Sequence, residues 1–201
     1  MNVQIESARL AQQIQFVIEI DKLKGILRQT LLTDSSRREN SAEHSWHLAM
    51  MAIALCEYSP VPVDTLRVIK LLLIHDLVEI DAGDTFCYDA QGNQDKADRE
   101  IAAADRLFGL LPTDQGTKLR ALWDEFEAKI TPEARFARAL DCLQPLLHNW
   151  QTDGGTWRIH TITRSQVLGR MQPVKDVSPE LWSLVETILN EAIAAGHLQN
   201  E

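Results

Sequence analysis

The chain has 201 residues, 45% of them hydrophobic and 24% charged, which fits one ordinary soluble domain with a full core. Its formal net charge of -9 argues against a non-specific nucleic-acid binder, because such proteins need a basic face to neutralise phosphates. No run of about eighteen apolar residues is present, so no membrane span is expected. The first seven residues do not resemble a signal peptide, and the three widely spaced cysteines fit reduced thiols. We therefore expect a cytoplasmic protein.

The first predicted helix covers residues 8–20, because apolar residues recur there at helical spacing. The residues expected to face inward are Leu10, Ile14, Val17 and Ile18. Residues 23–28 fit a short helix or turn. A polar loop at 33–38 follows, and it ends in two adjacent arginines, Arg37 and Arg38.

The second predicted helix starts at Asn40 and runs to about Tyr58, before two prolines. Asn40 and Glu43 form the pattern of a capping box, in which each residue satisfies a backbone N–H of the other. His44 shares one face with Leu48, Met51 and Leu55, so an imidazole is expected on the core-facing stripe. His47 lies off that stripe and is predicted to be exposed or partly buried.

A central helix begins after Asp64 and is apolar on nearly every side late in its course. It ends in His75-Asp76, two metal-capable side chains where a core helix normally has Leu or Ile. Glu79 follows four residues after His75, and so faces the same side one turn later. Gly83 then breaks the pattern, and residues 85–95 are predicted to form a loop beside this site.

The rest of the chain is predicted to be helical as well. The expected helices cover 96–110 with Ile101, Ala104, Leu107 and Phe108 inward; a segment from Thr113 with Leu119, Leu122, Trp123 and Phe126 inward; a segment from Pro132 with Phe136, Leu140, Leu143 and Leu147 inward; 163–171; and Ser178 to Gly196 with Leu181, Leu184, Val185, Ile188 and Leu189 inward. Pro145 should kink or end the helix that carries Asp141. Residues 153–155 fit a loop. No strand is expected, so the fold class is all-α with one domain over residues 1–201.

Four residues of metal-ligand type thus lie on three apolar helices: His44, His75, Asp76 and Asp141. Two imidazoles and two carboxylates suit a divalent first-row metal, and facing helices of a bundle often build such sites. Each residue alone has an ordinary structural explanation, a satisfied core histidine or a capping aspartate. The set is harder to explain in this way, because a core would then contain four polar side chains with few cationic partners.

The order of these residues resembles the HD-domain superfamily of metal-dependent phosphohydrolases. The strings that carry the resemblance are Arg38–Ser45, His75–Glu79, Ala82–Asp84 and Ala139–Asp141. Together they look like the branch that includes the 5′-deoxynucleotidases. The resemblance covers about residues 16–150, and the helices of 151–201, which contain no motif, are expected to pack on this HD domain.

The resemblance implies a buried site between helices where His44, His75, Asp76 and Asp141 bind one divalent metal ion. It does not distinguish Mn, Co, Mg, Zn and Fe. Glu79 and Asp84 are implied to act in catalysis. Arg28 matches a phosphate-binding arginine, and a guanidinium does bind phosphate through paired hydrogen bonds.

An alternative for Arg28 is a surface arginine that covers the end of the first helix and packs through its aliphatic stem. As a phosphate-binding residue it is expected to touch neither a metal ligand nor the core. Arg37 and Arg38 are weaker candidates for the phosphate, and their alternative is a solvated pair. Gln29 and Thr30 stand where several nucleotidases have a tryptophan beside the sugar, so the preference for base and sugar is left open.

The leading hypothesis is a phosphomonoesterase that releases phosphate from ribo- or deoxyribonucleoside 5′-monophosphates. Its expected partner is a small phosphorylated substrate, with neither nucleic acid nor a membrane involved. The alternatives are an HD hydrolase of a nucleoside triphosphate or a sugar phosphate, a non-catalytic regulator that binds metal or nucleotide, and a purely structural helical module. The oligomeric state is open, and a homodimer is one option.

Overall fold

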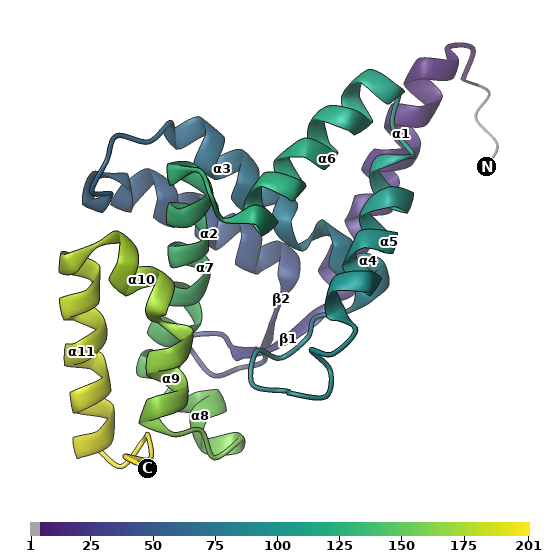
Figure 1. The fold of residues 1–201 in the computed structure, drawn as a ribbon. Helices are drawn as coiled ribbons and strands as arrows, with labels where there is room; N and C mark the ends of the chain where they lie inside the picture. The colour runs from purple at the N-terminus through teal and green to yellow at the C-terminus, as the bar shows by residue number, and fades with distance from the viewer. Residues whose placement is uncertain (1–4) are drawn as a thin grey trace.

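The computed structural model describes residues 5–201, and helices dominate it (Figure 1). Its first half contains α1 (Ala8–Ile20), the 3-10 helix η1 (Asp21–Gly25), β1 (Leu27–Leu31), β2 (Arg38–Asn40), α2 (Ser41–Leu55), η2 (Cys56–Tyr58), α3 (Thr65–Ile74), η3 (His75–Val78) and α4 (Glu79–Ala82). Its second half contains α5 (Lys96–Phe108), α6 (Thr113–Ala128), α7 (Pro132–Gln151), α8 (Gly155–Ile159), α9 (Arg164–Arg170), α10 (Gln172–Val177) and α11 (Pro179–Ala194). The predicted all-α class is confirmed.

Local capping explains where the site-bearing helices start. At α2, the Asn40 side chain accepts from the backbone N–H of Glu43, whose carboxylate accepts from the N–H of Asn40. The side chain of Asp64 caps α3, and Thr131 caps α7 ahead of a proline at the first helical position. The predicted starts of these three helices are therefore confirmed.

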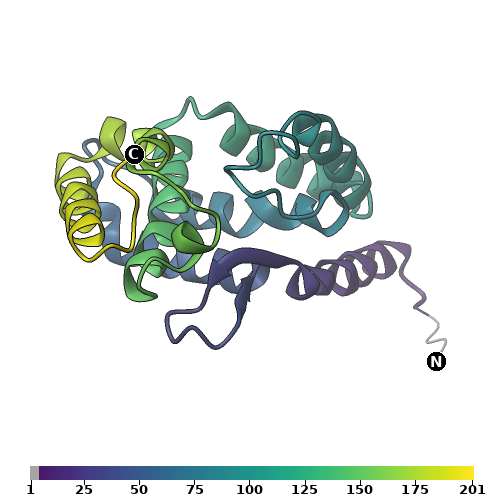
Figure 2. The same ribbon diagram turned by 90° about the horizontal axis from the view of Figure 1, so that it is seen from below.

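The short helix or turn predicted for residues 23–28 is confirmed only for its first half, which lies in η1, because β1 begins at Leu27; the expectation of no strand is wrong. β1 pairs antiparallel with β2, and the register shifts between the pairs Leu27–Asn40 and Leu31–Arg38. Such short strands lack a readable alternation of apolar and polar residues, because their stability comes from pairing and from contacts with α7 and α8. Figure 2 shows the hairpin lying beneath the helices, with α1 extending beyond it.

Two hydrophobic clusters divide the core. One joins α2, α3 and α7 with the C-terminal helices α9, α10 and α11, and the other joins α1, α5, α6, η1 and η3. The end of α3 lies where they meet, because Leu72 belongs to the first cluster while Leu77 and Val78 belong to the second. The segment with His75 and Asp76 is therefore held from both sides.

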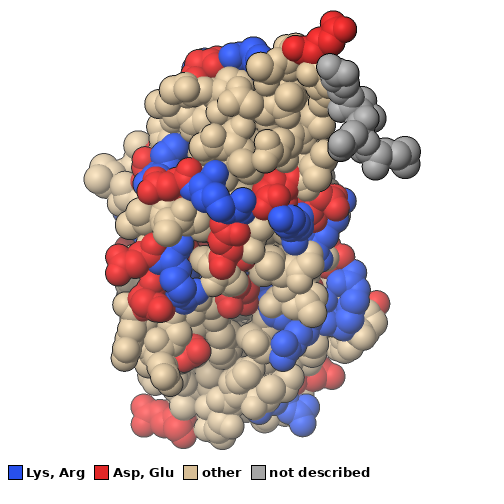
Figure 3. All heavy atoms as spheres, turned by 90° about the vertical axis from the view of Figure 1, so that its right-hand side faces the viewer, with Lys and Arg blue, Asp and Glu red and all other residues tan. Residues whose placement is uncertain are grey.

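The inward face predicted for α1 is wrong. The apolar side chains of its predicted stripe are exposed, from 39% at Ile14 to 65% at Ile18, while Phe16 is the buried residue of the helix. The face of the molecule drawn in Figure 3 has a band without charged side chains below its top edge, and acidic and basic side chains are interspersed below that band. None of the helices within residues 5–201 has the length and apolar character that a membrane span requires.

Other departures are local. Helix α7 continues through Pro145 to Gln151, so Pro145 does not end it. Because proline has no N–H, the carbonyl of Asp141 loses its usual helical donor at that point. Ile101 and Leu184 are partly exposed rather than inward, and Gly155 starts the short helix α8 instead of a loop.

Candidate metal centre

The four predicted metal ligands come together from three helical segments. His44 lies in the first turn of α2, Asp141 lies in the middle of α7, and His75 and Asp76 form the start of η3. All four are buried, with at most 8% of each residue exposed. Asp141 Oδ1 lies 3.1 Å from His44 Nε2 and 3.8 Å from His75 Nε2. Asp76 contributes Oδ1 at 3.0 Å from His75 Nε2 and Oδ2 at 3.8 Å from His44 Nε2.

Hydrogen bonds behind the two imidazoles determine which nitrogen faces the site. His75 Nδ1 donates to the carbonyl of Leu72 at 2.8 Å, and His44 Nδ1 donates to the side-chain carbonyl of Gln144 at 3.1 Å. In the neutral form of each ring the proton is on Nδ1, so Nε2 is the nitrogen that faces the carboxylates and can offer a lone pair to a metal. The buried Nε2 of His75 has no hydrogen-bond partner within residues 5–201. Lone pairs and carboxylate oxygens repel each other unless a cation lies among them, so this donor set fits a divalent metal.

The charged groups around the two imidazoles favour a positive charge between the imidazoles and the carboxylates. Burial alone would lower the pKa of His75, but Asp76 and Asp141 raise it to about 9. For His44, burial and the Arg28 guanidinium lower the pKa to about 4. Asp141 keeps a pKa well below its usual range despite burial, because Arg138 and the two imidazoles favour its charged form. The site thus holds its carboxylate charge and leaves His44 neutral, as a metal ligand must be.

Arg28 reaches the site from β1. Its Nη1 donates to Asp76 Oδ2 at 2.9 Å and lies 3.7 Å from Asp84 Oδ1, and only 11% of its side chain is exposed. The surface alternative is therefore wrong, as is the expectation that Arg28 touches no predicted ligand. Its buried Nε has no hydrogen-bond partner within the described residues, with Glu39 Oε2 3.6 Å away. Arg37 instead pairs with Glu43 near the surface.

The two predicted catalytic acids flank the ligands. Glu79, at the start of α4, accepts from Ser41 Oγ at 2.7 Å, and burial together with Asp76 raises its pKa well above the usual range. Asp84 follows Gly83, whose φ of +75° ends α4 in a conformation that favours glycine. Burial also raises the pKa of Asp84, although Arg28 opposes this shift.

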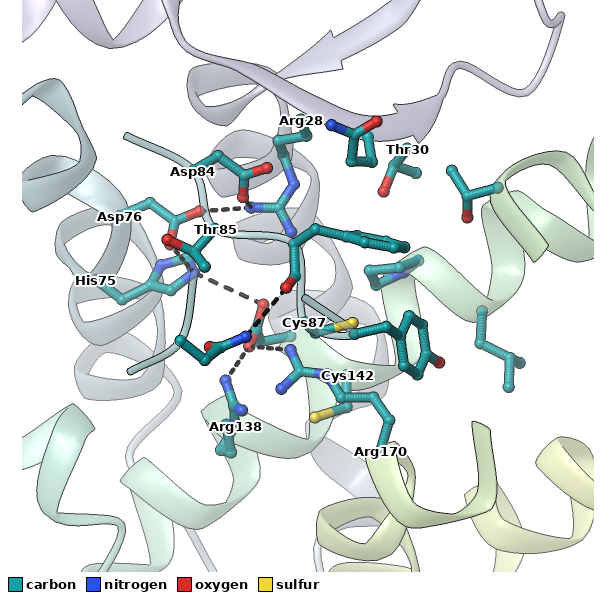
Figure 4. Close-up of a pocket in the computed structure, with 18 of the residues that line it drawn as sticks. Arg28, Thr30, His75, Asp76, Asp84, Thr85, Cys87, Arg138, Cys142 and Arg170 are labelled. Atoms are coloured by element: carbon teal, nitrogen blue, oxygen red, sulfur yellow. Dashed lines mark hydrogen bonds and ion pairs between the residues drawn. The ribbon is translucent and has the colours of Figure 1, made fainter. Parts of the chain in front are cut away.

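A pocket opens beside these residues (Figure 4). The predicted loop at 85–95 forms one wall, and its aromatic side chains Phe86 and Tyr88 meet edge to face at 5.3 Å. Other lining residues come from α7, α8 and α9, among them Arg138, Trp157 and Arg170. The predicted position of this loop beside the site is confirmed.

Sequence reasoning missed three polar residues at this site. Gln144 supports His44, and Arg138 and Arg170 both hydrogen-bond to Asp141 Oδ2, at 2.5 and 3.3 Å. Arg138 and Gln144 stand three residues before and after Asp141, so they share its helix face, and that spacing was a usable signal. Arg170 lies 29 residues away in α9, and its position depends on tertiary packing.

A second group of metal-capable side chains, Glu39, His47 and His148, lies behind His44. Gln144 ties this group together, because its amide donates to Glu39 Oε1 at 2.6 Å and lies 3.0 Å from His148 Nε2, while Glu39 Oε2 has no hydrogen-bond partner within residues 5–201. His148 Nδ1 donates to the carbonyl of Leu31 in β1. His47 is partly buried. We infer that this group supports the predicted ligand His44 through hydrogen bonds.

Comparisons with known proteins agree with this geometry. The family model of the HD domain matches residues 20–182. A solved structure from Magnetospirillum magnetotacticum MS-1, described as a "predicted metal-dependent phosphohydrolase", is 55% identical, covers 98% of this chain and all of that one, and has a TM-score of 0.92. The 5′-deoxynucleotidase HDDC2 of Xenopus laevis is 32% identical over 67% of this chain, and the human HDDC2 is 29% identical over the same share.

These matches span 66% and 65% of the two HDDC2 proteins, slightly less than two thirds of their lengths. The resemblance inferred from the four local strings is confirmed at the level of family and fold. With a family model over most of its length, and with buried His44, His75 and Asp141 arranged so that they could hold a metal ion and Asp76 beside them, the chain belongs to the HD-domain family.

Proposed function

We propose that this HD-domain protein is a metal-dependent phosphohydrolase that releases phosphate from ribo- or deoxyribonucleoside 5′-monophosphates. The observation that carries the proposal is the juxtaposition of two imidazole Nε2 atoms and two carboxylates with arginine side chains at one pocket. Phosphohydrolase and 5′-deoxynucleotidase names among similar proteins support it.

In this proposal His44, His75, Asp76 and Asp141 hold one divalent metal ion. When bound, the metal supplies Lewis acidity, which lowers the pKa of water and polarises phosphoryl oxygens. The protein contributes the fixed geometry of the ligands and a site largely shielded from solvent, where electrostatic interactions are stronger than in water.

Arg28 is proposed to bind the phosphoryl group through its guanidinium and to stabilise charge that develops on the phosphoryl oxygens. Hydrolysis adds water to phosphorus and breaks the bond to the ester oxygen, so the leaving nucleoside must gain a proton. Glu79, buried and held by Ser41, is proposed as the proton carrier, and Asp84 is proposed to orient Arg28 or the substrate.

A nucleoside is favoured as the leaving group by the aromatic residues of the pocket. The ring centroid of Phe86 lies 5.3 Å from that of Tyr88 and 4.6 Å from that of His160, and Trp157 lines the same pocket. Flat apolar side chains of this kind suit the faces of a nucleobase.

The test is phosphate release by the purified protein with added Mn²⁺, Co²⁺, Mg²⁺, Zn²⁺ or Fe²⁺. The substrate panel contains ribo- and deoxyribonucleoside 5′-monophosphates, nucleoside triphosphates and sugar phosphates. We expect the highest kcat/KM for a nucleoside 5′-monophosphate, and we expect His75→Ala and Asp76→Ala to lose both metal and activity. A higher kcat/KM for a triphosphate or sugar phosphate would contradict the proposed substrate class. Stoichiometric metal binding without hydrolysis of any of these compounds would contradict the proposal that the protein is an enzyme.

A further inference from the structure

Two arginines from different helices converge on one oxygen of Asp141. Arg138, on α7, donates to Asp141 Oδ2 at 2.5 Å, and Arg170, the last residue of α9, donates to the same oxygen at 3.3 Å. Both side chains line the pocket and keep 22% of their surface exposed. In the view of Figure 4 they approach from one side and Arg28 from the other.

The pair carries more charge and more donors than Asp141 can satisfy. Each guanidinium offers about five N–H donors, yet within residues 5–201 each makes one hydrogen bond, the one to Asp141. In the same described part of the chain, Asp141 is the only acid whose carboxylate lies within 4 Å of either guanidinium. Two cations therefore share one anion, whose other oxygen faces His44 and His75.

Acids such as Glu79 and Asp84 also line the pocket, but they lie more than 4 Å from both guanidinium groups, so the imbalance is local to this wall. Such a local imbalance in a largely buried wall is costly unless an anion balances it. A phosphate group supplies both the missing negative charge and several acceptor oxygens, and guanidinium groups bind it through paired hydrogen bonds. Asp141 Oδ2 is bonded to the same carbon as the Oδ1 that faces the imidazoles. An anion on the two arginines would therefore lie next to the metal ligands.

We infer that Arg138 and Arg170 form an anion subsite for the phosphoryl group of the substrate, facing Arg28 across the metal ligands. The inference rests on the proposed function and extends it, because it assigns a binding residue to the C-terminal segment 151–201. That segment then does more than pack against the HD domain. The ligand class is the dianionic phosphate of a monoester, or inorganic phosphate as the product.

The test is calorimetric titration of inorganic phosphate into the Mn²⁺-loaded protein, with Mn²⁺ affinity measured separately. We expect Arg138→Met and Arg170→Met each to weaken phosphate binding about tenfold or more, because a charge-assisted hydrogen bond is lost. Arg170→Lys should show a smaller loss, since it keeps the charge without the planar fork. Phosphate is titrated at saturating Mn²⁺, because both arginines bond to Asp141 and their loss can change Mn²⁺ affinity as well.

Matched controls are Arg135→Met on α7 and Arg164→Met on α9. Arg135 bonds only to the carbonyl of Asp176 among the described residues, and neither control residue lines the pocket. Both controls should bind phosphate as the wild type does. Circular dichroism verifies folding, and if a Met variant fails to fold, the Lys variant at the same position replaces it.

The inference is overturned if the variants bind phosphate with wild-type affinity once saturated with Mn²⁺, whether or not their Mn²⁺ affinity has fallen. A fall confined to Mn²⁺ affinity would mean that the arginines only position Asp141. Phosphate binding that depends on both arginines, in a protein that hydrolyses no monoester, would refute the proposed function and leave the anion subsite standing.

Discussion

Gln144 connects the metal ligands to the support behind them. Its side-chain carbonyl accepts from His44 Nδ1, while its amide donates to Glu39 and lies 3.0 Å from His148 Nε2. The carbonyl of Gln144 cannot donate, so His44 must carry its proton on Nδ1 and present Nε2 to the metal. One buried amide thereby sets the tautomer of a predicted ligand.

Replacing Gln144 by Met should weaken metal binding by about ten- to a hundredfold, because the support of a histidine ligand is removed. Stability should fall as well, since the buried N–H of His44 loses its acceptor. Isothermal titration with Mn²⁺ measures the first effect. Gln172→Met is the control, because Gln172 bonds to Asp176 at the surface. Equal Mn²⁺ affinity in Gln144→Met and the wild type would show that Gln144 does not orient His44.

Glu79 should be needed for turnover and not for metal binding. Glu79→Gln can keep the contact with Ser41 but cannot transfer a proton, so we expect kcat to fall about a hundredfold or more. Steady-state kinetics and metal analysis of the same sample separate the two effects. Loss of metal from this variant would place Glu79 among the ligands instead.

Arg28→Lys should lower kcat/KM on the best monophosphate by about ten- to a hundredfold, since Lys keeps the charge and loses the fork. Because Arg28 also donates to Asp76, metal affinity has to be measured alongside. If Arg28→Lys had the wild-type kcat/KM at saturating metal, Arg28 would have no role in phosphate binding.

At the scale of elements, the start of α2 positions a ligand. His44 lies in the first turn, directly behind the capping box of Asn40 and Glu43. Helix ends fray most readily, so loss of the cap should disturb His44 more than a residue in the middle of the helix.

We expect Asn40→Ala to destabilise the protein by about 1 kcal/mol and to weaken Mn²⁺ binding severalfold. Thr163→Ala is the matched control, because Thr163 forms a capping box with Gln166 at the start of α9. It should lose similar stability, about 2–4 °C in Tm, while Mn²⁺ affinity is kept. Thermal melts and metal titrations of both variants decide the matter. If Asn40→Ala bound Mn²⁺ as tightly as Thr163→Ala does, the cap at Asn40 would not contribute to metal binding.

Features that neighbouring residues encode could be predicted from the sequence, whereas features that depend on tertiary contacts could not. The cap at Asn40 and the apolar stripe that contains His44 are local, and both were predictable. β1 was missed because a short strand is defined by its partner and by the helices it contacts. In α1 the stripe was read correctly as apolar and wrongly as buried, because this helix lies at the edge and packs mainly through Phe16. Arg170 had no local signal at all.

At the scale of the whole molecule, the predicted metal centre lies where the two hydrophobic clusters meet. α2 and α7 belong to the first cluster, and the segment after His75 belongs to the second through Leu77 and Val78. A metal held by His44, His75, Asp76 and Asp141 would link these segments to one another. The predicted ligand cluster should therefore matter for stability as well as for chemistry.

Removal of the metal should lower Tm. A ligand that binds only the folded state at a free concentration of about 100 times its Kd adds about 2.7 kcal/mol, which for a chain of this size corresponds to about 5–11 °C. Thermal melts with excess Mn²⁺ and with EDTA measure this difference. In His75→Ala the same comparison should give almost no shift, because the variant has lost a ligand whose Nε2 is buried and faces two carboxylates. A wild-type Tm that is equal with Mn²⁺ and with EDTA would mean that the cluster holds no metal, whereas an equal shift in His75→Ala would place the stabilising ion elsewhere.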